Sequence, residues 1–226
     1  MSSIKQDRFG GILFLVAGIS FGASAALFFL ADVVAVQNVT RIAYGVLALF
    51  FLAGLGCPSA LSSQTPPEGS FDRWILTLAT VGLAVGLVDS MRGSYLGTLF
   101  PWPAGFPSLL KRTDPLGLVT FPAIGLWVLV SGRKLRRLAP PRHGLGHLGL
   151  ACGLLLFLPP ITETLGMLGW KYIVPVFGVV VLLMFGMVLL WFGGVGLLLL
   201  KPAAARDEPG QAQERAWPGD GGGTVR

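Results

Sequence analysis

Charge is what this sequence has least of. Only 12% of its 226 residues are Asp, Glu, Lys or Arg, whereas 53% are hydrophobic, and the mean hydropathy is +0.72. Soluble globular domains carry about 25% charged residues. The shortage of charge therefore excludes an ordinary soluble domain and indicates a protein whose helices lie in a lipid bilayer.

Residues that commonly carry chemistry are also scarce. The two cysteines, Cys57 and Cys152, fall inside apolar runs, which indicates small buried side chains rather than a disulfide. The two histidines, His143 and His147, have no nearby Asp or Glu to complete a ligand set, so we expect interface histidines and no metal. No phosphate-binding loop, HExxH, GxSxG, GxGxxG or paired CxxC motif occurs, so we expect no enzyme and no cofactor.

What the sequence has in abundance is long apolar runs. Six of them are long enough, or nearly so, to cross a hydrocarbon core of about 30 Å as helices. They are residues 9–30, 42–61, 74–91, 116–132, 144–162 and 173–200. Backbone groups in lipid have no water to bond, so each run is expected to be helical. The predicted fold is an all-α membrane protein, a bundle of six transmembrane helices.

The two ends of the chain differ from these spans. Residues 1–8 form a short N-terminal segment, and the first run contains an Ala-Ser-Ala sequence at residues 23–25 that resembles a signal cleavage site. The run continues past that site to Leu30, so we expect a retained span. Residues 201–226 are rich in Pro, Ala, Gly and mixed charge, and we expect a disordered tail.

The connection between the fourth and fifth runs sets the orientation. Arg133-Lys-Leu-Arg-Arg-Leu-Ala-Pro-Pro-Arg142 holds five basic residues in ten positions, and basic connections stay cytoplasmic in bacterial-type membranes. With this connection inside, twelve of the seventeen Lys and Arg residues lie inside and five outside. We therefore predict cytoplasmic termini in a bacterial inner (plasma) membrane. The net charge of +6 then reports topology and not nucleic-acid binding.

Three acidic residues mark the ends of the odd-numbered spans. In the predicted topology Asp32, Asp89 and Glu163 lie in one layer at the outer ends of their helices, and the bases Arg92 and Lys171 follow the last two of them. Two interpretations stay open. The five residues form solvated helix ends, or they line an outward-facing polar site, because an ionisable group inside a membrane is usually functional.

Small residues at four-residue spacing recur on several spans. They are Gly18, Gly22 and Ala26, Gly82 and Gly86, and Gly149 and Gly153. Such faces allow helices to approach closely. The contact is either within one bundle or with a second copy or another membrane protein.

The six spans, the connection 133–142 and the Gly-rich last span together resemble the small, uncharacterised six-span inner-membrane proteins of bacteria. The resemblance implies a membrane bundle and transfers no activity and no functional residues. Two functions from different classes follow from the residues. The first is a structural or accessory bundle that associates with itself or with another membrane protein. The alternative is a small-solute or ion carrier with an outward-facing site near Glu163, Asp89 and Asp32.

Overall fold

The computed structural model describes residues 2–34, 37–98, 114, 117–138, 142–158, 160–161 and 173–201. These residues form helices and turns, with no strand among them, so the predicted all-helical class is confirmed. The elements are α1 (Ser2–Val34), α2 (Gln37–Gly54), α3 (Cys57–Ser62), α4 (Ser70–Gly93), the 3-10 helix η1 (Tyr95–Thr98), α5 (Thr120–Arg136), α6 (Arg142–Leu155) and α8 (Ile173–Leu200).

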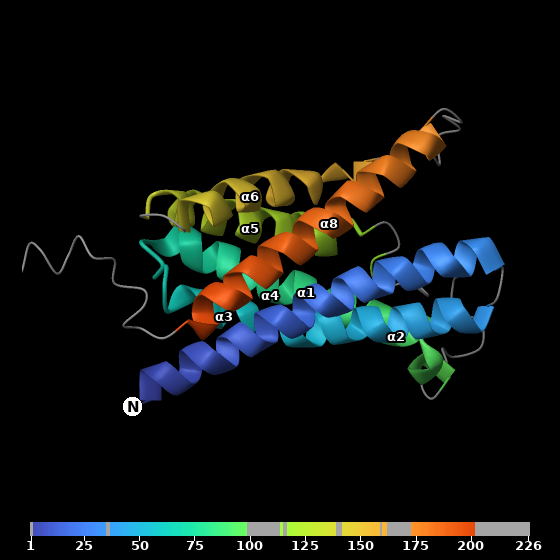
Figure 1. The fold of residues 1–226 in the computed structure, drawn as a ribbon, viewed down its shortest axis with the longest axis horizontal. Helices are drawn as coiled ribbons and strands as arrows, with labels where there is room; N and C mark the ends of the chain where they lie inside the picture. The colour runs from blue at the N-terminus through green and yellow to red at the C-terminus, as the bar shows by residue number, and fades with distance from the viewer. Residues whose placement is uncertain are drawn as a thin grey trace, which may run out of the picture.

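The six longer helices of the described chain form a closed ring in chain order. α1 packs against α2, α2 against α4, α4 against α5, α5 against α6 and α6 against α8, and α8 returns to α1. Figure 1 shows them side by side, with α8 crossing the others at an angle. Each helix therefore packs against the helices next to it in the sequence, and the first and last helices close the ring, as in an up-and-down bundle.

One end of the bundle gathers the first residues of α1, the last residues of α8 and both ends of the connection 133–142, and we call it the basic end. Gly11 of α1 packs against Leu200 of α8, and Gly146 of α6 packs against the backbone of Arg136 of α5. In Figure 1 the N-terminus, α3 and the red end of α8 all lie at this end. Which side of a membrane the basic end faces stays a prediction.

Within the described residues, four helices are long and apolar enough to cross a membrane, which is compatible with a membrane protein. They are Asp7–Ala31, Asn38–Ser62, Ser70–Gly93 and Leu182–Leu200. α5 has 17 residues and α6 has 14. At 1.5 Å per residue these two rise about 26 Å and about 21 Å, less than a core of about 30 Å. The spans at 116–132 and 144–162, and with them the count of six, therefore stay predictions.

Two helix boundaries differ from the apolar runs for local reasons. The run 116–132 begins before α5, because Gly117 adopts a left-handed φ of +63° and forms a turn ahead of Thr120. The run 42–61 is divided between α2 and α3. Pro58, in the first turn of α3, has no N–H to continue the preceding helix, so the helix restarts there.

Aromatic side chains fill the centre of the ring. The ring of Phe14 in α1 lies 6.3 Å from that of Trp127 in α5 and 5.9 Å from that of Trp191 in α8. Phe50 of α2 reaches Phe192 of α8 at 5.5 Å in an edge-to-face contact. All five side chains are at most 2% exposed. Helices that are not neighbours in the ring are thus joined through large buried aromatic surfaces.

The predicted small-residue faces are used inside this bundle. A Cβ added at any of the six glycines would meet another helix of the same chain. Gly18 and Gly22 face α8, Gly82 faces α5, Gly86 faces α2, Gly149 faces α5 and α8, and Gly153 faces α5. Ala26 is exposed. Packing within one bundle accounts for these six glycines. Contact with a partner would therefore use other surfaces of the bundle.

Candidate functional site

The predicted outer layer belongs to the end of the bundle opposite the basic end. Asp32 lies in the last turn of α1, and Asp89 and Arg92 lie in the last two turns of α4. The side chain of Asp32 and the whole of Glu163 and Lys171 lie outside the described residues. The grouping of these five residues into one site therefore stays a prediction.

Tyr44 of α2 joins the ends of α1 and α4 at this level. Its ring lies 4.9 Å from the ring of Phe28 in α1 and packs against Gly93 in α4. Asp89 and Arg92, three residues apart on α4, are both half-buried in the last two turns, which end at Gly93. The structure thus brings together the two helix ends that carry two of the three predicted acids.

A lysine–aspartate pair that hydropathy and motifs do not reveal lies at the basic end. Nζ of Lys134, in the last turn of α5, donates to Oδ2 of Asp72 in the first turn of α4 at 2.6 Å. It also donates to the carbonyl of Pro66 at 2.9 Å. The same Asp72 oxygen accepts the backbone N–H of Glu68 at 2.7 Å. The side chains of Lys134 and Asp72 are 14% and 15% exposed, so these charge-assisted bonds are partly shielded from water.

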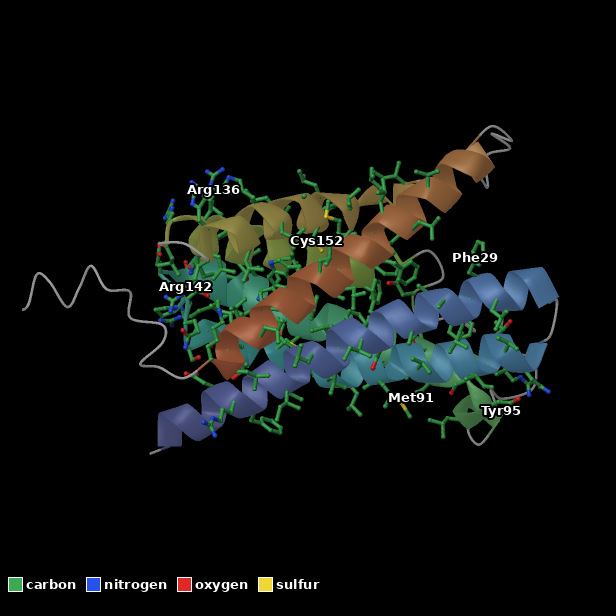
Figure 2. All side chains as sticks on the ribbon, in the orientation of Figure 1. Phe29, Met91, Tyr95, Arg136, Arg142 and Cys152 are labelled. Atoms are coloured by element: carbon green, nitrogen blue, oxygen red, sulfur yellow. The ribbon has the colours of Figure 1, made fainter. Side chains whose placement is uncertain are left out.

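Asp7 of α1 holds the other side of the same connection. Its carboxylate accepts the hydroxyl of Ser63 at 3.2 Å and the amide of Gln64 at 3.3 Å. The connection between α3 and α4 is therefore bonded to α1 through Ser63 and Gln64 and to α5 through Pro66. Figure 2 shows that side-chain oxygens and nitrogens gather at this end of the bundle.

A small pocket lies beside the Lys134–Asp72 pair, between α3, α4 and α5. Its lining combines apolar and polar side chains, among them Leu61, Thr65, Ile75, Trp127 and Ser131. The volume in which the centre of a water molecule fits is about 20 Å³. One or two ordered waters fit into such a space, whereas small-molecule sites usually measure about 300–1,000 Å³. The pocket can hydrate the ion pair but does not admit an organic substrate in this conformation.

A second carboxylate that the motifs do not reveal starts α5 at the opposite end. Asp114 is 7% exposed and accepts the N–H of Val119 at 3.2 Å and that of Thr120 at 2.7 Å. Unpaired N–H groups at a helix start stabilise a negative charge there. Asp114 is accordingly a helix cap. The sequence signal that could have found this cap is the position of Asp114 shortly before the apolar run 116–132.

The two histidines lie together on the first turns of α6. Their ring centroids are 4.5 Å apart, as expected for residues four apart on a helix that begins at Arg142. Nδ1–H of His143 donates to the carbonyl of Arg136 at 2.6 Å, and Nδ1–H of His147 donates to the carbonyl of His143 at 3.1 Å. Both rings are exposed. In the described part of the chain no three His, Cys, Asp or Glu side chains gather as a metal ligand set.

No protein-family model, curated protein or solved structure matches this chain. Function is therefore inferred from the geometry of this chain alone. This geometry comprises an all-helical ring with four apolar helices, an aromatic centre, and two ends with different polar chemistry.

Proposed function

We propose that this chain is a multi-pass protein of the bacterial inner membrane with a structural or accessory role, in which the bundle associates with a second copy or with another membrane protein. The observation that carries this proposal is the aromatic filling of the ring by Phe14, Trp127 and Trp191. Carriers place their solute site near the middle of the bundle, where broken helices expose backbone groups. A centre of packed aromatic rings favours a structural role instead.

The proposal includes six spans and cytoplasmic termini. Its support is the basic end, where the first residues of α1 and the last residues of α8 lie beside the connection 133–142. Basic connections of this kind are retained on the cytoplasmic side. The role is proposed to be non-enzymatic and to need no cofactor, in keeping with the lack of catalytic motifs in the sequence.

The proposed contact surface is a small-residue face of α8. At Gly186 and Gly193 no atom from another helix in the described part of the chain lies within 4 Å of the position that a Cβ would take. The two glycines are seven residues apart and therefore share a face of the helix with the exposed Leu190 and Leu197. Two small residues flanked by leucines allow a second helix to approach closely and bury apolar surface against it.

The replacement of both glycines by leucine tests this proposal. The Gly186→Leu/Gly193→Leu variant is expected to lose self-association, because the added side chains keep the second helix away. Energy transfer between labelled copies in proteoliposomes measures association, and it should fall to the level of non-interacting chains. The control Ala84→Leu also places a leucine at an exposed position, on α4, and should leave the transfer unchanged.

Two outcomes would contradict the proposal at different points. A wild-type chain that is monomeric at every protein-to-lipid ratio and copurifies with no membrane protein would remove the proposed role. If energy transfer fell equally in the double variant and in Ala84→Leu, the chain would still associate, but the contact could not be assigned to α8.

The second candidate function is a small-solute or ion carrier with an outward-facing site near Asp32, Asp89 and Glu163. The observation in its favour is that Asp89 and Arg92 are half-buried in the last two turns of an apolar helix that is long enough to span a membrane. Ionisable side chains at that depth are costly unless they serve a purpose.

A further inference from the structure

Four arginines at the basic end form a surface that we call the arginine patch. It consists of Arg133, Arg136, Arg137 and Arg142. The first three are exposed and Arg142 is half-buried, and across the described residues no ion pair involves any of them. Figure 2 shows Arg136 and Arg142 at the same end of the bundle, where α5 ends and α6 begins.

The geometry of α5 separates these arginines from the lysine within the same run. Arg136 and Arg137 follow Arg133 by three and four residues, so both lie on the same side of the last turn as Arg133. Lys134 lies about 100° around the helix from Arg133, and its side chain points toward α4, where it pairs with Asp72. The basic residue that faces into the bundle is thus neutralised, and the arginine charges stay directed outward.

The patch is held in place by contacts between α5 and α6. Nδ1–H of His143 donates to the carbonyl of Arg136 at 2.6 Å, and Gly146 packs against the backbone of Arg136. Arg142, the first residue of α6, is therefore fixed near the arginines of α5. A preformed surface loses less conformational entropy when it binds a ligand.

The level of the patch relative to a membrane follows from α4. Trp74 is 73% exposed and stands two residues after Asp72, which bonds to Lys134 between the arginines of α5. Exposed tryptophans at the ends of membrane helices lie at the level of the lipid headgroups. In a chain that spans a membrane, the arginine patch would accordingly lie at headgroup depth.

We propose that the arginine patch binds the phosphate groups of anionic phospholipids in the leaflet at the basic end. Guanidinium groups bind phosphate through two parallel N–H bonds, and clusters of basic residues next to membrane spans attract acidic lipids. This inference goes beyond the structural role proposed above. It requires that the chain spans a membrane and does not depend on which protein the bundle contacts.

The test uses the purified full chain in neutral detergent micelles, titrated with phosphatidylglycerol. Thermal unfolding at each lipid fraction yields an apparent affinity, because a ligand that binds the folded state raises the unfolding temperature. We expect a saturable rise that weakens as salt is added. Phosphatidylcholine and inorganic phosphate at the same concentrations should produce much smaller rises.

Two charge-matched variants locate the binding surface. Arg136→Gln/Arg137→Gln should lose about 25-fold in apparent affinity for phosphatidylglycerol, at about fivefold for each arginine. Arg8→Gln/Arg73→Gln removes two exposed charges from the same end outside the patch and should change the affinity less than about fivefold. Arg136→Lys/Arg137→Lys keeps the charge but not the bidentate geometry, so an intermediate loss is expected. If the glutamine variant does not fold, the lysine variant serves as the test of the patch in its place.

Several results would overturn the inference. They are an equal response of wild type to phosphatidylglycerol and phosphatidylcholine, equal losses in the patch variant and the Arg8/Arg73 variant, and an unchanged affinity in both patch variants. Inorganic phosphate that binds as tightly as the lipid would also reject it, because the ligand would then be a free anion.

Discussion

The two ends of the bundle are held together by different kinds of interaction. At the basic end, hydrogen bonds to carboxylates join separate elements, since Lys134 of α5 bonds Asp72 of α4 and Asp7 of α1 bonds the connection that follows α3. At the opposite end a ring contact joins α1 to α2, since the ring of Tyr44 lies 4.9 Å from that of Phe28.

Two further contacts are described at the opposite end. The guanidinium of Arg41 lies 5.5 Å from the ring centroid of Tyr95, which joins α2 to η1 by a cation–π contact. The carboxylate of Asp114 bonds the start of α5 and no more distant helix among the bonds described. Hydrogen bonds to charged groups demand particular partners and directions, whereas ring packing tolerates small shifts. We therefore expect the connection after α3 at the basic end to be held in one geometry.

The largest expected difference between the ends is the side of the membrane that each one faces. A reporter that fluoresces only in the cytoplasm should be bright when it is fused after Arg137 or after Arg226. It should be dark when it is inserted within residues 93–110, because the basic connection retains its end of the bundle inside. A bright insertion at Gly105 would reverse the orientation.

The next largest effect compares one glycine near each end. A Cβ at Gly146 would collide with the backbone of Arg136, whereas a Cβ at Gly45 would lie 3.8 Å from Cβ of Ser94, an ordinary contact. Gly146→Ala should therefore lower the free energy of unfolding by about 2 kcal/mol through overpacking. Gly45→Ala should raise it by up to about 1 kcal/mol, because alanine is the better helix former. Unfolding in detergent measures both, and equal losses would contradict the close α5–α6 contact.

Loss of the ion pair at the basic end should have a comparable or smaller effect. Lys134→Met leaves Asp72 without its charged partner, at an expected cost of about 2 kcal/mol in unfolding free energy. This value lies between about 3–5 kcal/mol for fully buried pairs and about 0–1 kcal/mol for surface pairs, because both side chains are about 15% exposed. The neighbouring exposed Arg133→Met is the control and should change stability by less than about 0.5 kcal/mol.

A double-mutant cycle checks that the effect belongs to the pair. Asp72→Asn/Lys134→Met should cost less than the sum of the two single variants, since the second change removes a charge already left unpaired. Strict additivity would show that the two side chains do not stabilise each other.

The smallest effects are expected at the predicted outer acids. If these are helix ends at the interface, as the structural role implies, Asp89→Asn and Glu163→Gln should each cost no more than about 1 kcal/mol in unfolding free energy. A loss of about 3 kcal/mol or more in either variant would instead indicate a buried charge and favour the carrier. Thermal unfolding of both variants beside wild type distinguishes the two functions.

Hydropathy located the helices well. The run 173–200 coincides with α8, and the runs 9–30 and 74–91 fall inside α1 and α4. This success has a simple cause, because the transfer of a long apolar segment from water depends on its summed composition and not on its neighbours. Boundaries were less predictable where one residue decides the backbone. Gly117 turns the chain inside an apolar run and delays the start of α5.

The candidate site shows the opposite case. Lys134 and Asp72 are 62 residues apart in the sequence, and no pattern along the chain links them. They meet because α4 and α5 are neighbours in the ring and are rotated so that the two side chains face each other. The outer acids could be placed at one end from the sequence, but whether their side chains converge depends on the same rotations.

By itself, the sequence determined the helical class, the apolar segments and the concentration of basic residues between two of them. The tertiary structure decided which face of each helix points inward. α8 illustrates the reason, since it is apolar all round and its periodicity therefore marks no buried side. Leu190 is 61% exposed and the adjacent Trp191 is fully buried. Only the packing of α1 and α6 against α8 separates these two neighbours.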